Sequence, residues 1–314
     1  MGIMQDPALL FLNLFLVSST FSYEIADEFK SNPLPELETI KLEATASLGR
    51  GPDRENSGIV KSRNHEDVYW MQNDSGDEPR IYAVNRKGEV YGAERYEDLT
   101  GVYIGGAINV DWEDIAVDDS GNILIADVGN NCNCRKDLVI YVVPEPRPEA
   151  GRTPYLRKLF FEYPDQYNFP APSGDFNYDC EGIFTVGDTI YILSKNRSDS
   201  FAKLYKLKDP KEGKINKLKY IGRFDVHGKS TASDTTVDGL QLIITTYDLI
   251  WHFKRENTRQ SFFDGEISVG KFEAPQVEAA CFIDPETLVL ACEQSATLFE
   301  VKVSDLKPYK PNKN

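Results

Sequence analysis

The sequence predicts an all-β fold, a five-bladed β-propeller of four-stranded antiparallel blades. The first observation is a unit of two short apolar runs joined by a tight turn, which recurs five times at intervals of roughly 45 to 70 residues, a spacing typical of propeller blades. The second is a composition of 22 Gly, 17 Pro, 17 Phe and 16 Tyr in 314 residues, which suits many short strands joined by turns. The third is the strand count, because the last unit lacks one strand and a spare strand precedes the first unit.

The clearest copy of the unit spans residues 111–129. The apolar run 112–117 carries acidic residues at its front edge, the turn 118–121 follows, and the second apolar run 122–128 includes Asp127 near its end. Period-two strands joined by such a turn form an antiparallel pair. Aligned on the residue at the front edge of the first strand, the five units carry Ser57, Glu113, Glu181, Ser233 and Glu278.

Two further strands are expected after each leading pair. The predicted pairs are 80–85 with 89–96, 138–143 with 155–163, 203–207 with 218–224, and 250–254 with 266–272. The fifth unit has 297–303 and no outer strand. Residues 37–46 alternate apolar and polar side chains, so we expect them to supply that strand and close the ring. Six blades are the alternative, but a sixth would need about 40 more residues of strand.

The N-terminal region contains the apolar run 8–17, which is too short to span a membrane and suits the core of a secretion signal. The residues ahead of it lack Lys and Arg and include Asp6, so a buried element of the mature domain is the alternative. We predict a signal peptide over 1–22, a linker over 23–36, one propeller domain over 37–306 and a loose tail over 307–314. The protein is then secreted or periplasmic, with no membrane span after signal removal.

Charge and cysteine content restrict the partners. The net charge is −15, which argues against binding to nucleic acid or to anionic membranes. Cys132 and Cys134 have no second pair at a zinc-binding interval. Cys281 and Cys292 lie on neighbouring predicted strands, where a disulfide is geometrically conceivable.

In a propeller the first strand of every blade lines the central channel, so the five front-edge residues meet at one mouth. Three carboxylates in a narrow channel are costly unless a cation balances them or some are protonated. A set of carboxylate and hydroxyl oxygens without His or thiolate suits Ca²⁺, and Mg²⁺ less well. We therefore expect Ca²⁺ at Ser57, Glu113, Glu181, Ser233 and Glu278. The alternative is that these acids bond only to backbone amides of the next blade.

The ends of the second strands should surround this ring, and they carry Asp74, Asp127, Lys195, Tyr247 and Glu293. Two longer connections, 129–136 and 164–178, are the loops in which specificity is expected. Lys195, Arg197, Arg135 and Tyr247 are candidate ligands for an anionic substrate, with Lys136 beside them.

The order Ser, Glu, Glu, Ser, Glu around five blades resembles the calcium ring of the five-bladed calcium-activated nucleotidases, the secreted apyrases. The segments Asp74-Ser75-Gly76 and 192–198, the latter in the blade of Glu181, are also similar to that family. The resemblance implies that Lys195 and Arg197 face phosphate, and it covers the frame and the ring but not the loops. The motifs at 112–116 and 246–248 also resemble a group of secreted bacterial propellers of unassigned activity.

Three functions follow from these features. The first is a calcium-dependent hydrolase of phosphorylated or other anionic small molecules, for which Asp74 and Asp127 are candidate catalytic carboxylates. The second is a non-enzymatic propeller that binds an extracellular partner and uses calcium as a structural ion. The third is a lactonase or esterase, for which His227 would be the base.

Overall fold

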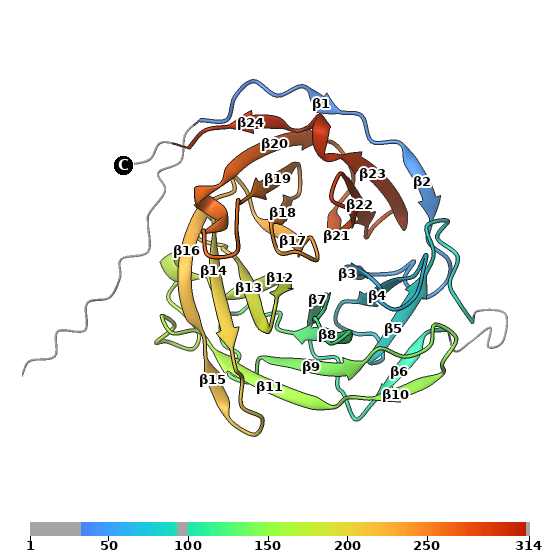
Figure 1. Ribbon diagram of the computed structural model, residues 1–314. Helices are drawn as coiled ribbons and strands as arrows, with labels where there is room; N and C mark the ends of the chain where they lie inside the picture. Colours follow the sequence, from blue (N-terminus) through green and yellow to red (C-terminus); the bar gives the residue numbers. More distant parts are fainter. Residues whose placement is uncertain (1–32, 93–99, 312–314) are drawn as a thin grey trace, which may run out of the picture.

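Five small sheets stand side by side around a central axis and form a five-bladed propeller (Figure 1). The computed structural model describes residues 33–92 and 100–311. Each innermost strand contacts the innermost strands of both neighbouring blades, and the fifth returns to the first. The predicted fold class is therefore confirmed, with five blades and not six.

The strands run from the axis outward in each blade. The innermost strands are β3 (Asn56–Lys61), β7 (Trp112–Val117), β12 (Asp179–Val186), β17 (Ser230–Thr235) and β21 (Val277–Asp284). The second strands are β4 (Tyr69–Asn73), β8 (Asn122–Asp127), β13 (Thr189–Lys195), β18 (Gln241–Thr246) and β22 (Thr287–Cys292). The third strands are β5 (Arg80–Val84), β9 (Val139–Pro144), β14 (Phe201–Lys208), β19 (Leu249–Lys254) and β23 (Thr297–Lys302). The fourth strands are β6 (Val102–Gly105), β11 (Arg157–Glu162), β16 (Lys219–Asp225), β20 (Glu266–Phe272) and β2 (Ala44–Ser47).

The N-terminal strand closes the ring as predicted, although it is shorter than expected. β2 pairs antiparallel with β23 and completes the fifth blade. The preceding β1 (Thr39–Ile40) instead pairs in parallel with β20 of the fourth blade, so the expected strand 37–46 is divided between two blades. The blue N-terminal segment lies along the rim of the red and orange blades in Figure 1.

Three short parallel strands lie on the outer edges and connect neighbouring blades. β10 (Arg152–Pro154) pairs with β6 of the first blade, and β15 (Ile215–Lys217) pairs with β11 of the second. Both belong to the sequence segment that builds the following blade. The same is true of β1, the third of these strands. These strands cover edges whose amide and carbonyl groups would otherwise lack partners.

One strand prediction and the prediction of a loose tail are wrong. The fourth strand of the first blade was expected at 89–96, but it is β6, because Gly88 and Gly92 have φ angles of 79° and 78° and turn the chain there. Residues 93–96 lie outside the described residues. The tail was expected to be loose from residue 307, but β24 (Lys307–Tyr309) pairs with β20, and Tyr309 is buried against Trp251.

Among the described residues the hydrophobic core consists of five clusters, one between each pair of neighbouring blades. Because both faces of each sheet are covered, the innermost strand β7 and the second strand β22 are buried along their whole length. The only helices in 33–92 and 100–311 are three 3₁₀ turns, η1 (Ser173–Asp175), η2 (Phe262–Asp264) and η3 (Val303–Asp305), and none is long and apolar enough to cross a membrane. The predicted signal peptide lies outside the described residues.

Candidate functional site

A β-bulge interrupts every innermost strand at the same end of the channel. One residue in each blade has no partner on the second strand, and these residues are Ser57, Glu113, Glu181, Thr231 and Glu278. A bulge kinks the strand and redirects the side chain of the extra residue. The bulge therefore repeats in the backbone of all five blades, and its position defines which residues are equivalent.

Four of the five expected ring residues occupy this position, and the alignment of the fourth blade was wrong. Thr231 is the equivalent residue there, and Ser233 lies two residues further along, opposite Ile244. The Ser233 hydroxyl is buried without a hydrogen-bond partner in the described structure. Thr231 bonds through its hydroxyl to Thr245 at 3.0 Å.

Carboxylates gather on the first three blades at this mouth. One oxygen from each of Asp74, Asp111 and Glu113 lies within 4.8 Å of the others. The same holds for Glu113, Asp179 and Glu181, so Glu113 belongs to both triads. Glu113 is buried, and in the described structure the one hydrogen bond to its carboxylate is a 3.5 Å contact from the Ser57 hydroxyl.

Sequence reasoning missed Asp111 and Asp179. Each lies two residues before a bulge glutamate, in Asp111-Trp112-Glu113 and in Asp179-Cys180-Glu181. The shared Asp-x-Glu spacing in two blades was the signal that could have identified them, because strand alternation directs residues i and i+2 to the same face.

Burial and mutual repulsion raise the pKa values of several carboxyl groups at this mouth. Burial, followed by the charges of Glu181 and Asp74, raises the pKa of Glu113 well above its usual range. Burial and the neighbouring Asp74 raise the pKa of Asp111 to about 6. At the fifth blade, burial and Glu278 raise the pKa of Glu293 to about 7. The cluster therefore holds less negative charge at neutral pH than its composition suggests unless a cation is bound.

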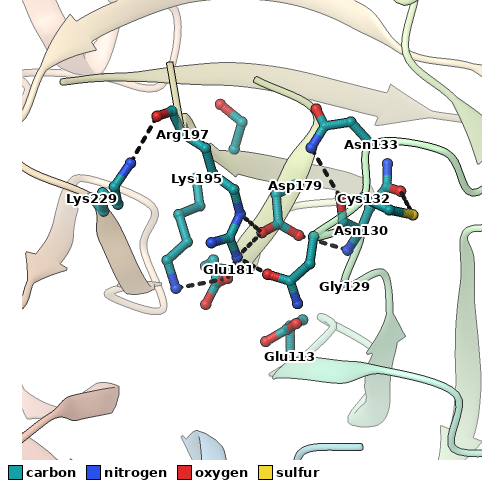
Figure 2. Close-up of polar contacts among 12 residues, drawn as sticks. Glu113, Gly129, Asn130, Cys132, Asn133, Asp179, Glu181, Lys195, Arg197 and Lys229 are labelled. Carbon is teal, nitrogen blue, oxygen red and sulfur yellow. Dashed lines mark hydrogen bonds and ion pairs between the residues drawn. The ribbon is translucent and has the colours of Figure 1, made fainter. Parts of the chain in front are cut away.

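Two of the predicted substrate-binding cations are already paired with acids of the cluster (Figure 2). Lys195 Nζ lies 2.9 Å from Glu181 Oε1, and both side chains are buried. Burial opposes the charge of Lys195, but Glu181 more than offsets it and raises the pKa of the ammonium group. Arg197 donates from Nε to Asp179 at 2.8 Å and stays partly exposed. Both therefore orient carboxylates, whatever else they contact.

The backbone of Gly129 provides room for two of the carboxylates. A Cβ atom at this position would overlap Glu113 Oε1 and Asp111 Oδ2. The amide of Gly129 donates to the carbonyl oxygen of Asp111 at 3.0 Å, which keeps the chain against the cluster. Glycine is needed here for close approach.

The two long loops that the sequence singled out are joined to each other beside Asp179. Asn133, buried and with φ of 48°, accepts the amide of Tyr178 at 2.8 Å and donates to the carbonyl of Asn130 at 3.0 Å. The amide of Asn130 in turn donates to Asp179 at 2.6 Å. A disulfide links Cys132 to Cys134 in the same loop, whereas Cys281 and Cys292 are free thiols. The loops thus form one wall of the site.

The remaining predicted residues lie around the cluster with different partners. Asp127 is buried and forms an ion pair with Arg135 at 2.9 Å, so both act on loop structure. Tyr247 is 42% exposed, with the Lys195 ammonium 5.4 Å from its ring centre. His227 has φ of 54°, and its ring stacks on Trp251. Lys136 lies over the ring of Phe169.

The opposite mouth of the channel opens into a cavity of about 1080 Å³. Its walls come from the turns between first and second strands, and they include Lys61, His65, Asp234 and Phe282. Burial raises the pKa of Asp234 to about 7, and its carboxylate accepts the amide of Phe282 at 2.8 Å. Asp234 therefore joins the fourth and fifth blades as well as lining the cavity.

Comparison with known proteins gives no functional assignment. No family model matches the chain, and none of the curated proteins matches it. Among solved structures, the chain is similar to Kuenenia stuttgartiensis hydrazine synthase, with a TM-score of 0.44 and 10% identity over 79% of this chain and 72% of that one. It is also similar to virginiamycin B lyase from Staphylococcus aureus (TM-score 0.37, 14% identity, 81% and 68% covered). A catalytically inactive variant of that lyase with quinupristin gives a TM-score of 0.36 and 13% identity over the same shares.

Proposed function

We propose that this propeller binds Ca²⁺ at the acidic mouth and hydrolyses phosphorylated small molecules there. The observation that carries the proposal is the pair of carboxylate triads that share Glu113. Of the five carboxylates in the two triads, only Glu181 and Asp179 form ion pairs with described residues, and Glu113 is buried with a single long hydrogen bond. Such a charge excess is stabilised by a bound cation.

The donor set fits calcium. All the ligands on offer are oxygen atoms, and Ca²⁺ takes six to eight of them at 2.3–2.6 Å, in flexible geometry. Asp111, Glu113, Asp179 and Glu181 would hold the ion, with Asp74 beside them. Of the ring expected from the sequence, Ser57 supports Glu113 through a 2.8 Å bond to its carbonyl oxygen, and Glu278 lies toward Lys195 and Glu293.

A bound Ca²⁺ polarises a phosphoryl oxygen and lowers the pKa of a bound water. The residues of the chain position the ligands, contact the substrate and accept a proton. Lys195 and Arg197 hold Glu181 and Asp179 in place, and the exposed ring of Tyr247 offers a surface to the organic part of the substrate. Glu293, with a pKa of about 7 and a buried Oε2 that accepts no hydrogen bond in the described structure, accepts a proton near neutral pH.

A binding protein with a structural cation is the second candidate. It is favoured by one observation, that Lys195, Arg197 and Arg135 each already have a carboxylate partner and so offer less charge to a substrate. We also propose that the protein acts outside the cytoplasm. The apolar run 8–17 and the Cys132–Cys134 disulfide support this, because disulfides persist in oxidising compartments.

Metal content and turnover test the proposal. Calcium titration by calorimetry and melting curves with and without chelator should show binding that Glu181→Gln and Glu113→Gln abolish, whereas the exposed control Glu212→Gln keeps it. Phosphate release is then measured from nucleoside di- and triphosphates, sugar phosphates and phytate, with lactones and aryl esters in parallel. Calcium-dependent phosphate release supports the hydrolase. Bound calcium without turnover supports the binding protein, and no calcium binding refutes both.

A further inference from the structure

The position two residues before each bulge forms a second ring, and its chemistry changes in the fourth blade. The residues there are Glu55, Asp111, Asp179, Lys229 and Gln276. Blades one to three carry a carboxylate, and two of these carboxylates belong to the acidic cluster. The fourth blade carries an ammonium group, and its bulge residue is the neutral Thr231.

Lys229 is placed beside the cluster without a carboxylate of its own. Its Nζ donates to the carbonyl oxygen of Arg197 at 3.0 Å (Figure 2) and to that of Asn196 at 3.3 Å. It forms no ion pair with any residue in 33–92 or 100–311. An ammonium group has three N–H donors, so one remains available. Asp199 and Asp179 act on it only at longer range.

The neighbours of Lys229 disfavour its positive charge more than they compensate it. Arg197 and Lys195, which approach it, are each bound to a carboxylate. Burial and then these two cations lower the pKa of Lys229. An anion that binds here relieves that repulsion and gains a charge-assisted hydrogen bond.

We propose that Lys229 is the anion-binding residue of the mouth, and that it takes a phosphoryl oxygen of a phosphate ester. The substrate class rests on the proposed function. A phosphate ester is a dianion at neutral pH, so it offsets the positive charge of Lys229 more fully than a carboxylate with a single charge does. Because Thr231 is neutral, the bulge position of the fourth blade adds no carboxylate that would repel the anion.

Phosphate titration of three variants tests this assignment. Binding of inorganic phosphate, sulfate and acetate is measured by calorimetry and by ³¹P NMR, with submillimolar calcium and separately with chelator. Lys229→Gln removes the charge at similar length, and Lys229→Arg keeps the charge. Lys219→Gln is the matched control, since Lys219 is an exposed lysine on β16. We expect Lys229→Gln to weaken phosphate binding at least tenfold, Lys229→Arg to stay within about threefold of wild type, and the control to be unchanged.

The outcomes separate this inference from the proposed function. Phosphate binding by Lys229→Gln at wild-type strength, or no saturable phosphate binding by the wild type in either buffer, overturns the role of Lys229 even if calcium binds. Lysine-dependent phosphate binding in chelator, in a protein that takes no calcium, supports the role of Lys229 and refutes the metal site. Acetate binding as strong as phosphate binding, equally dependent on Lys229, overturns the assignment to phosphate esters.

Discussion

Gly129→Ala tests whether the two carboxylates of the second blade, Asp111 and Glu113, act together on one ion. The added methyl group would overlap Glu113 Oε1 and Asp111 Oδ2, so both oxygens must withdraw by roughly 1 Å to reach van der Waals distance. That shift exceeds the spread of Ca–O distances, which is about 0.3 Å. The backbone of Gly129 is not in the left-handed region, so alanine adds no strain of its own.

The expected shift in melting temperature follows from the linkage between calcium binding and folding. At calcium a hundredfold above its dissociation constant, binding stabilises the native state by about 2.7 kcal/mol. For a chain of this length that is a rise in melting temperature of roughly 4 °C. If displacement of two ligands weakens binding about a hundredfold, the same calcium concentration gives about 0.4 kcal/mol and a rise below about 1 °C.

The assay is differential scanning fluorimetry in chelator and in calcium, with Gly151→Ala as the matched control. A Cβ atom at residue 151 meets nothing within 4 Å, and that glycine also has no positive φ. The control should keep the full calcium-dependent shift. Gly129→Ala with a wild-type shift would refute the reasoning, because the two oxygens could not then be ligands in the positions described.

The other predictions concern pH, an ion pair and a loop. Because the pKa values of Asp111 and Glu293 are raised to about 6 and about 7, the calcium-free native state binds protons that the unfolded chain has lost, so its free energy of unfolding falls as the pH rises from about 4 to about 7 in urea titrations. The affinity for calcium changes with pH in the opposite direction. As the pH drops below about 6 it falls about tenfold per pH unit for each proton that calcium must displace, as calorimetry across pH 5 to 8 would show. Lys195→Met leaves Glu181 buried without its cation, so the protein in chelator should lose about 3 to 5 kcal/mol of stability in urea unfolding. The same variant should bind calcium more tightly, and weaker calcium binding would contradict this. Asn133→Ala should cost on the order of 2 kcal/mol in urea unfolding, and Asn133→Gly less, because only glycine tolerates the positive φ without a side-chain bond.

The blade repeat could be predicted from the sequence because it depends on local patterns. An apolar pair with a turn is visible in any single unit, and the missing strand of the last blade implied its replacement by residues 37–46, of which only the end forms part of β2. The alignment failed in the fourth blade because Thr231 looks like an ordinary strand residue, while Ser233-Asp234 imitates the front edge of the other units. Only the hydrogen-bond register shows which residue forms the bulge.

The composition of the site was less predictable, since it depends on pairs from different blades. The ring glutamates followed from alignment, but the pairing of Lys195 with Glu181 and of Arg197 with Asp179 depends on side-chain direction. Sequence reasoning treated both cations as free for substrate and passed over Lys229, whose role emerges only when the fourth blade is aligned by its bulge.

Closure of the ring by β2 has a consequence for how the chain assembles. The hydrogen bond from Thr45 to Leu298 joins residues 253 positions apart, so it cannot form until synthesis has passed Leu298. By then the residues of the acidic cluster, from Asp74 to Glu181, have long been synthesised. The face of the first blade that includes Tyr69 and Met71 has no partner until the fifth blade arrives. At about 5 to 20 residues per second that interval lasts several seconds or more, during which the nascent protein carries an apolar surface that chaperones or other unfinished chains can bind.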